Sequence, residues 1–202
     1  MKKTISVLVL VLLCSLGAFA QDVPKAELFV GYNYVRVNST TDVPAFSSNG
    51  GSGQLAINFN KYLSGVADFG VYHNGVIAGY SVNNNIINYL FGPRLSLRKG
   101  RVTPYFNILF GGVYAAAQAT TQGQVCTGTS CIPSAVHLTN SQNAFAMAVG
   151  GGLDIKVAKH VAFRPIGLDY FLTRLYNPVN ANDHNQNNLR YSAGVNFLFG
   201  GQ

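Results

Sequence analysis

The sequence is poor in charge, and it lacks a long apolar run outside its first twenty residues. Asp, Glu, Lys and Arg make up 10% of the 202 residues, whereas a soluble domain carries about 25%. Beyond residue 20, no segment has the roughly 18 consecutive apolar residues of a membrane-spanning helix. The first absence argues against an ordinary soluble surface, and the second argues against a helical membrane protein. A chain that meets lipid on alternate residues would account for both.

Cysteine is also scarce, with three residues in the whole chain. Cys14 lies in the N-terminal apolar stretch, so the rest of the chain holds Cys126 and Cys131, in the polar segment "QVCTGTSCIPS". In an oxidising compartment, we expect these two cysteines to form a small local disulfide. A metal site is the alternative, but no further Cys and no close His supports it.

The N-terminus has the features of a secretory signal peptide. Lys2 and Lys3 form a basic head, residues 5–16 are apolar, and Ala18-Phe19-Ala20 fits a cleavage site. We predict cleavage between Ala20 and Gln21. Residues 1–20 would then be a signal peptide, and residues 21–202 would form a single barrel domain. A transmembrane anchor and a lipoprotein signal at Cys14 are the alternatives.

Apolar residues recur at every second position in the remainder of the chain. In "LRYSAGVNFLF" (189–199), one face is entirely apolar and the other is mostly small or polar. This two-residue period is typical of β-strands. The seventh segment is the least regular, which predicts a bulge near Pro165–Gly167. The pattern predicts eight strands, at residues 26–37, 53–60, 63–73, 86–98, 103–115, 144–156, 161–173 and 189–199.

The connections between these segments alternate in length. Three are tight turns, with the sequences "NKY", "RKGR" and "VAKH". The other four are long and polar, at residues 38–52, 74–84, 116–142 and 174–187. Short turns at one end and long loops at the other are typical of outer-membrane barrels. The pattern leaves open a further strand within residues 116–142.

The residues opposite the apolar faces are mainly Gly, Ala, Ser and Asn, with isolated ions. They could not form the charged outer surface of a soluble barrel, such as a secreted lipocalin-like one. They could fill a narrow lumen while the large apolar residues face lipid, and closure would pair every backbone group. We therefore predict an all-β, eight-stranded antiparallel up-and-down transmembrane β-barrel.

Four segments resemble the small eight-stranded outer-membrane barrels of the OmpA-like and OmpX-like kind: "ELFVGYNY", "FGPRLSL", "PYFNILFGG" and "NNLRYSAGVNFLFG". The resemblance covers essentially the whole chain after the signal. It implies location in the bacterial outer membrane, contact with its lipid, and insertion by the barrel assembly machinery, with Phe199 as the assembly signal. Two features depart from the pattern: Gly-Gly-Gln follows Phe199, and Trp is absent.

Several charged residues fall on the faces predicted to point inward. Ions in a narrow lumen must pair or find water. They can therefore form a structural plug of ion pairs, or they can line a gated or narrow pore. Asp169 joins them if the predicted bulge is present. The others are Glu27, Asp68, Arg94, Asp154, Lys156, Arg164 and Arg190.

Basic residues also gather at the short turns, which hold Lys61, Arg98, Lys99, Arg101, and Lys159 with His160. If these turns face the periplasm, they lie beside the phosphates of the inner leaflet. Our hypothesis is that this basic rim orients the barrel and holds anionic lipid. The alternative is that the turns are simply solvated.

No recurring spacing of Ser, His and an acid involves His73, His137, His160 or His184, so we predict no catalytic residues. The Asn-rich segment 177–188 has too few acids for a strong calcium loop. We expect no metal, no cofactor and no nucleic-acid partner. The sequence favours a monomeric, non-enzymatic outer-membrane protein with a structural or surface-contact role. A porin-like narrow pore for small solutes and a lipid-modifying enzyme are the alternatives.

Overall fold

A computed structural model describes residues 23–39, 45–77, 80–127, 130–177 and 182–200. Side chains are described throughout these ranges except at 75–84, 117–140 and 175–184. The predicted signal peptide and its cleavage site between Ala20 and Gln21 lie outside the described residues.

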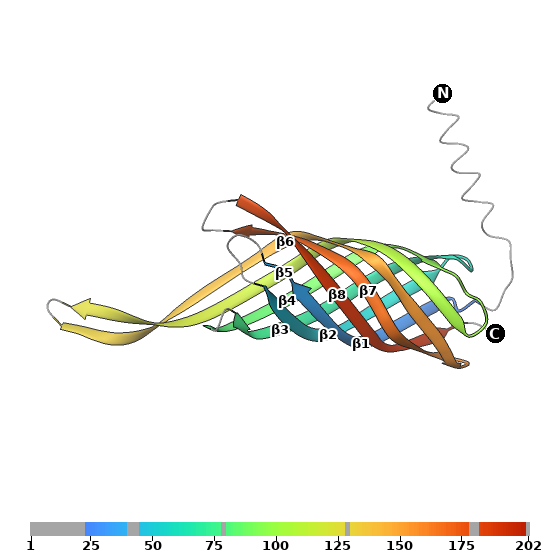
Figure 1. Ribbon diagram of the computed structural model, residues 1–202, viewed down its shortest axis with the longest axis horizontal. Helices are drawn as coiled ribbons and strands as arrows, with labels where there is room; N and C mark the ends of the chain where they lie inside the picture. Colours follow the sequence, from blue (N-terminus) through green and yellow to red (C-terminus); the bar gives the residue numbers. More distant parts are fainter. Residues whose placement is uncertain (1–22, 40–44, 78–79, 128–129, 178–181, 201–202) are drawn as a thin grey trace, which may run out of the picture.

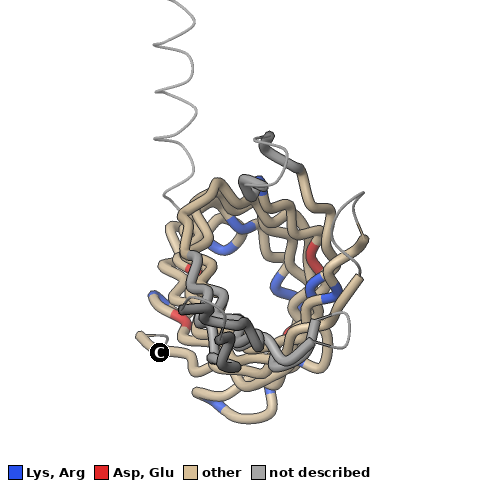
Figure 2. The backbone as a smooth tube through the Cα atoms, turned by 90° about the vertical axis from the view of Figure 1, so that its left-hand side faces the viewer, with Lys and Arg blue, Asp and Glu red and all other residues tan. Residues whose placement is uncertain are grey.

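The chain forms one closed barrel in which every strand pairs antiparallel with its neighbours in sequence, and β1 pairs with β8 (Figures 1 and 2). This confirms the predicted eight-stranded all-β fold. In the described part of the chain, no helix is long and apolar enough to cross a membrane. The strands are β1 (Ala26–Val37), β2 (Phe46–Asn58), β3 (Leu63–Ile77), β4 (Tyr80–Ser96), β5 (Val102–Thr127), β6 (Ser130–Ala158), β7 (Val161–Asn177) and β8 (Asn182–Phe199).

Large apolar side chains cover the outside of the barrel wall. They include Phe69 and Phe91, whose rings pack edge to face with centroids 5.7 Å apart. Between them in each strand lie the inward residues, which are mostly buried. Most are small, polar or paired ions, but large side chains such as Phe29, Leu109 and Phe171 also point inward. The last strand follows this rule, because Leu189 and Phe197 are exposed while Arg190 and Asn196 are buried. The predicted assignment of the two faces is therefore confirmed.

The three short turns are confirmed. They join β2 to β3, β4 to β5, and β6 to β7, at the end of the barrel where β1 begins and β8 ends. Asn60 shapes the first turn, because its Oδ1 accepts the backbone N–H groups of Tyr62 and Leu63, each at 2.8 Å. Gly100 provides the second turn with a positive φ of 62°, a conformation that favours glycine.

The predicted long loops are largely wrong, because the strands continue into them. β2 begins at Phe46 rather than at residue 53, and the segment 116–142 is the continuation of β5 and β6 rather than a further strand pair. The resulting β5–β6 hairpin extends beyond the other strands (Figure 1). Beyond the apolar band, both faces of a strand can meet water, so the alternation disappears while backbone pairing continues.

The predicted bulge in β7 is confirmed, because the β7–β8 register shifts between Arg164 and Gly167. The shift exchanges the two faces of the strand. As a result, Arg164 on one side of the bulge and Asp169 on the other are both buried.

Candidate functional site: an ion network in the barrel interior

The charged residues of the inner face are buried inside the barrel. Asp169, which the bulge turns inward, is among them, whereas Lys156 is exposed near the end of β6. Figure 2, a view along the barrel, shows basic and acidic positions distributed around its wall. The six buried residues named from the alternation alone are Glu27, Asp68, Arg94, Asp154, Arg164 and Arg190.

Two buried arginines form close pairs with carboxylates. Arg164 binds Asp154 through two contacts, Nε to Oδ1 at 2.7 Å and Nη2 to Oδ2 at 3.0 Å. Arg190 bridges two acids, with Nη1 3.0 Å from Asp68 Oδ1 and Nη2 2.8 Å from Asp169 Oδ2. Such two-point arginine contacts fix geometry as well as charge.

Arg98, which the sequence groups with the basic residues of the short turns, belongs to the network. Its Nη2 lies 2.6 Å from Glu27 Oε1 and 2.9 Å from Asn58 Oδ1. Its Nη1 donates to the carbonyl oxygen of Lys61 at 2.8 Å. Position 98 has the same parity as Arg94, so the inward face of β4 continues beyond the last residue of the strand.

Two neutral amides join the separate ion pairs. Asn196 Nδ2 donates to Glu27 Oε2 at 3.0 Å and to Asp154 Oδ2 at 3.2 Å. Gln54 Oε1 accepts from Arg164 Nη1 at 2.8 Å, and Gln54 Nε2 donates to Asp68 Oδ2 at 2.5 Å. Sequence reasoning missed both amides. Their parity places them on the inner face, but all their partners except Asp68 lie on strands that are distant in sequence.

Gln54 also accepts a hydrogen bond from Arg94, the one arginine of the network without a carboxylate contact among the described residues. Arg94 Nη2 donates to Gln54 Oε1 at 2.6 Å, and its guanidinium lies 4.4 Å from the centre of the Tyr105 ring. The network therefore runs without a break from Glu27, near the short turns, to Asp169. Its charge is balanced among the described residues: Arg94, Arg98, Arg164 and Arg190 face Glu27, Asp68, Asp154 and Asp169.

The guanidinium of Arg164 lies between two aromatic rings. Its Cζ is 4.1 Å from the centre of the Phe29 ring and 4.4 Å from that of Tyr105. The Phe29 ring has room because glycine faces it, since a Cβ on Gly31 would lie 2.4 Å from the ring. Stacking on an aromatic face adds to the ion pair and favours arginine over lysine at this position.

Apolar side chains also fill the interior beside the network, and we call them the apolar interior cluster. The two regions meet at Tyr72, whose hydroxyl oxygen lies 3.5 Å from Arg190 Nη1. Every buried charged side chain of the described residues belongs to the network. The cluster contains Val35, Val37, Ala56, Val66, Tyr72, Leu90, Leu109, Val113, Ala146, Ala148 and Phe171.

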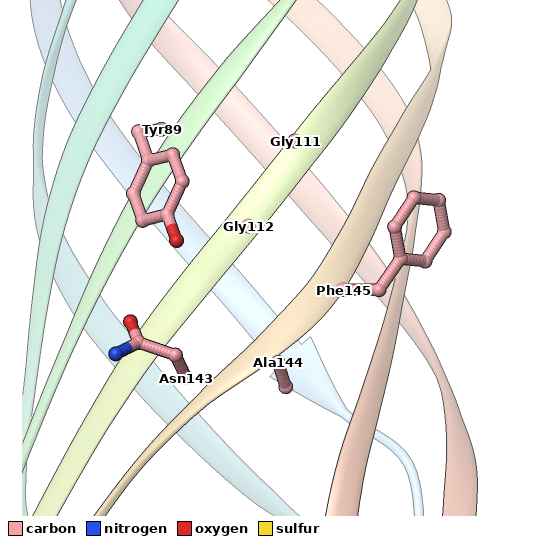
Figure 3. A pocket seen from close by; sticks show the side chains of 6 residues that line it. All are labelled: Tyr89, Gly111, Gly112, Asn143, Ala144 and Phe145. Atoms are coloured by element: carbon pink, nitrogen blue, oxygen red, sulfur yellow. The ribbon is translucent and has the colours of Figure 1, made fainter.

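A hollow of about 290 Å³ lies on the outer wall, between strands β4 and β6 (Figure 3). Tyr89 and Phe145 line it on either side of Gly112. A Cβ on Gly112 would lie 2.4 Å from the Tyr89 hydroxyl, so the glycine makes room for the tyrosine. The lining contains no carboxylate and no histidine, and its one hydroxyl is that of Tyr89.

The two histidines with described side chains contact neutral groups. His73 Nδ1 lies 2.9 Å from Asn85 Oδ1, and His160 Nδ1 lies 3.2 Å from the carbonyl oxygen of Leu198. No group of three His, Cys, Asp or Glu among the described residues could hold a metal ion.

The predicted disulfide and the two other histidines fall where side chains are not described. Backbone pairing places Cys126 opposite Cys131 in the β5–β6 hairpin. The side chains of both cysteines, and those of His137 and His184, lie outside the described side chains.

A closed barrel with an apolar outer wall and an ion-paired interior defines the class of outer-membrane barrels. The family model of the outer membrane protein beta-barrel domain matches residues 6–197, and the chain belongs to this family. It is thus a protein of the bacterial outer membrane, in contact with membrane lipid. A comparison with curated proteins found no match.

Two solved structures share the fold at low identity. Ail, the attachment invasion locus protein of Yersinia pestis, is 16% identical with a TM-score of 0.56, and the match covers 87% of this chain and 99% of Ail. Neisserial surface protein A is also 16% identical with a TM-score of 0.57, and the match covers 87% of this chain and 97% of that one. At this identity the likeness concerns the fold alone.

Proposed function

We propose that this protein is a monomeric, non-catalytic barrel with a closed interior, which supports the outer membrane and makes contacts at the cell surface. The observation that carries the proposal is the continuous, charge-balanced ion network inside the barrel. A permeating ion would have to separate pairs such as Arg164–Asp154, whose partners are held by two contacts and two aromatic rings.

The apolar interior cluster adds a second barrier of a different kind. Val35, Val113 and Phe171 are each less than 5% exposed and project from β1, β5 and β7 into the interior. An apolar constriction opposes permeation because it does not hold water well. The two regions together favour a plug over a pore.

Conductance in planar lipid bilayers tests the closed interior. We expect refolded protein to leave the bilayer silent, with heat-modifiable migration on a gel as the check that the barrel is folded. Steady openings whose size changes in an Arg94→Gln variant would contradict the proposal, because they would place a conducting path beside the network.

The surface-contact role rests on the β5–β6 hairpin, which extends past the rest of the barrel (Figure 1). Ail was solved in complex with the heparin analogue sucrose octasulfate. Residues 102–153 of this chain contain no Lys, Arg, Asp or Glu, so we do not extend polyanion binding to its hairpin. We propose contact through neutral polar groups and the backbone edges of the hairpin.

Shortening the hairpin tests this role. Replacing residues 117–140 with an Asn-Gly turn should leave a folded, heat-modifiable barrel, because such a turn suits two antiparallel strands. Adherence to cultured epithelial cells should then fall to the level of bacteria that lack the protein. Unchanged adherence with a folded barrel would refute the surface-contact role without affecting the closed interior.

We further propose a path to the membrane: export with cleavage after Ala20, a Cys126–Cys131 disulfide, and insertion by the barrel assembly machinery that reads Phe199. Phe199 is 51% exposed and pairs with Ala26 at the β1–β8 junction. A Phe199→Ala variant should accumulate less folded barrel in outer-membrane fractions. The intact mass of the purified protein tests both the cleavage site and the disulfide.

A further inference from the structure

The hollow on the outer wall lies where the apolar band of the barrel ends. On β6, Phe145 is 49% exposed, and the next outward residues along the strand, Asn143 and Ser141, are polar and exposed. On β4, Ile87 is exposed and is followed on the same face by Asn85. The short turns, which lie on the periplasmic side of outer-membrane barrels, are at the other end of both strands. The hollow therefore faces the external leaflet, at the boundary between hydrocarbon and water.

A glycine forms the floor of the hollow. Gly112 pairs with Tyr89 on one side and with Phe145 on the other. It is buried although its position on β5 faces outward, because the Tyr89 ring lies across it. A Cβ on Gly112 would lie 2.4 to 2.8 Å from three atoms of that side chain. Any larger residue here would displace the tyrosine, so the shape of the hollow depends on the glycine.

Two polar groups at the hollow have no partner of their own. Toward the same end of the wall, the hydroxyl of Tyr32 donates to Asn49 Oδ1 at 2.5 Å. In contrast, the Tyr89 hydroxyl and the Asn143 amide have no hydrogen-bond partner among the described side chains. Figure 3 shows both groups on the same side of the hollow, with the Phe145 ring on the other. The hollow thus offers two hydrogen-bond donors beside an apolar surface.

The hollow carries no charge. None of the residues that line it is charged, and residues 102–153, which include its β5 and β6 walls, contain no Lys, Arg, Asp or Glu. A phosphate or carboxylate would find no counter-charge there, whereas a hydroxyl and an amide suit a neutral acceptor. In a membrane lipid, the carbonyl groups that link the acyl chains are neutral acceptors, and they lie where the hydrocarbon ends.

We propose that this hollow binds an acyl lipid of the external leaflet. The acyl chain lies over Gly112 and against Phe145, and its linking carbonyl accepts hydrogen bonds from the Tyr89 hydroxyl and the Asn143 amide. A hydrocarbon chain without a carbonyl would fill the hollow but leave both donors unused. The site lies on the outer wall and does not depend on the barrel interior, so its failure would leave the closed interior unaffected.

Native mass spectrometry of lipids retained by the folded barrel tests the site. The protein is refolded in mixed micelles that contain equal amounts of an ester-linked phosphatidylethanolamine and its ether-linked analogue, which lacks both carbonyl groups. A neutral hydrogen bond is worth about fivefold in binding, so two should favour the ester lipid by roughly 20-fold. Tyr89→Phe/Asn143→Leu should abolish this preference. Gly112→Ala should reduce it, because the added methyl group displaces the Tyr89 ring.

A matched control makes the same two changes elsewhere on the wall. Tyr32→Phe/Asn49→Leu removes a tyrosine and an asparagine that already bond to each other, and it should leave the preference unchanged. A loss in this control as large as in Tyr89→Phe/Asn143→Leu would overturn the proposal in favour of a general effect of wall polarity. Equal retention of the two lipids by the wild type would also overturn it. A dimer that carries no lipid would do the same, because a second copy of the chain would then cover the hollow. Heat-modifiable migration verifies folding of each variant.

Discussion

The interior of this barrel is filled in two different ways, by paired charges in one region and by apolar side chains in the other. Toward the chain termini, charged side chains from distant strands pair in a balanced network. Around Val113, the interior contains apolar side chains and neutral polar ones, and this part meets the network at Phe171, whose ring centre lies 5.7 Å from the Arg190 guanidinium. The first region depends on the position of individual atoms, and the second depends mainly on filled volume.

This difference predicts how each region tolerates change. A buried charge that loses its partner keeps its desolvation cost, whereas a trimmed apolar side chain costs its lost contacts and the cavity that it leaves. Removal of one member of the network should therefore cause a large loss in the free energy of unfolding. Trimming a side chain of the apolar interior cluster should cause a smaller loss.

The largest expected effect is the loss of Arg164, which is fully buried and binds Asp154 through two contacts. Arg164→Met should reduce the free energy of unfolding by about 3–5 kcal/mol, because it leaves a buried carboxylate without its partner. Urea unfolding in lipid vesicles, followed by heat-modifiable migration, measures the change. Adding Asp154→Leu should recover most of the stability. If the double variant were no more stable than the single one, the pair would not be the reason for the loss.

The apolar interior cluster should give a smaller effect. Leu109 is fully buried, and Leu109→Ala should cost about 2–3 kcal/mol in the same unfolding measurement. Leu109→Met conserves volume and should cost less than about 1.5 kcal/mol. In contrast, Arg164→Lys conserves charge but should be poorly tolerated, because lysine cannot reproduce the two-point contact or the ring stacking. If Leu109→Met and Arg164→Lys lowered the free energy of unfolding by the same amount, the two regions would not differ in the way proposed.

The smallest expected effect within the network is at its bridging amide. Asn196→Leu removes the hydrogen bonds to Glu27 and Asp154 but leaves both carboxylates with their arginines. The cost should be about 1–2 kcal/mol. Asn143→Leu is the matched control, since Asn143 faces outward and is exposed, and it should lie within about 0.5 kcal/mol of the wild type. A cost at Asn196 no larger than at Asn143 would show that the network tolerates the loss of its bridges.

Much of this fold could be predicted because lipid imposes a strict alternation on each strand. That rule located the eight strands, the three tight turns, the bulge of β7 and the inward parity of residues such as Arg94 and Arg190. It fails beyond the apolar band, where water meets both faces of a strand. For that reason the extensions of β2, β5 and β6 were predicted as loops.

The partners inside the barrel could not be predicted in the same way. Gln54 contacts Arg164 across 110 positions of sequence, and the stagger of a closed barrel decides which inward residues share a level. Arg98 illustrates the same limit. Its parity pointed inward, but its place in a turn suggested solvent, and the decisive partner was Glu27 on another strand.

Asn196 has a consequence for the order in which the molecule can be completed. It belongs to the last strand, yet its amide contacts Glu27 from the first strand and Asp154 from the sixth. A chain that is still missing its C-terminal segment holds those two carboxylates without the group that joins them, and its first strand has an unpaired edge. The final strand therefore completes both the wall and the interior. A truncated chain would lack the pairing that closes β1 and also the amide that joins Glu27 to Asp154.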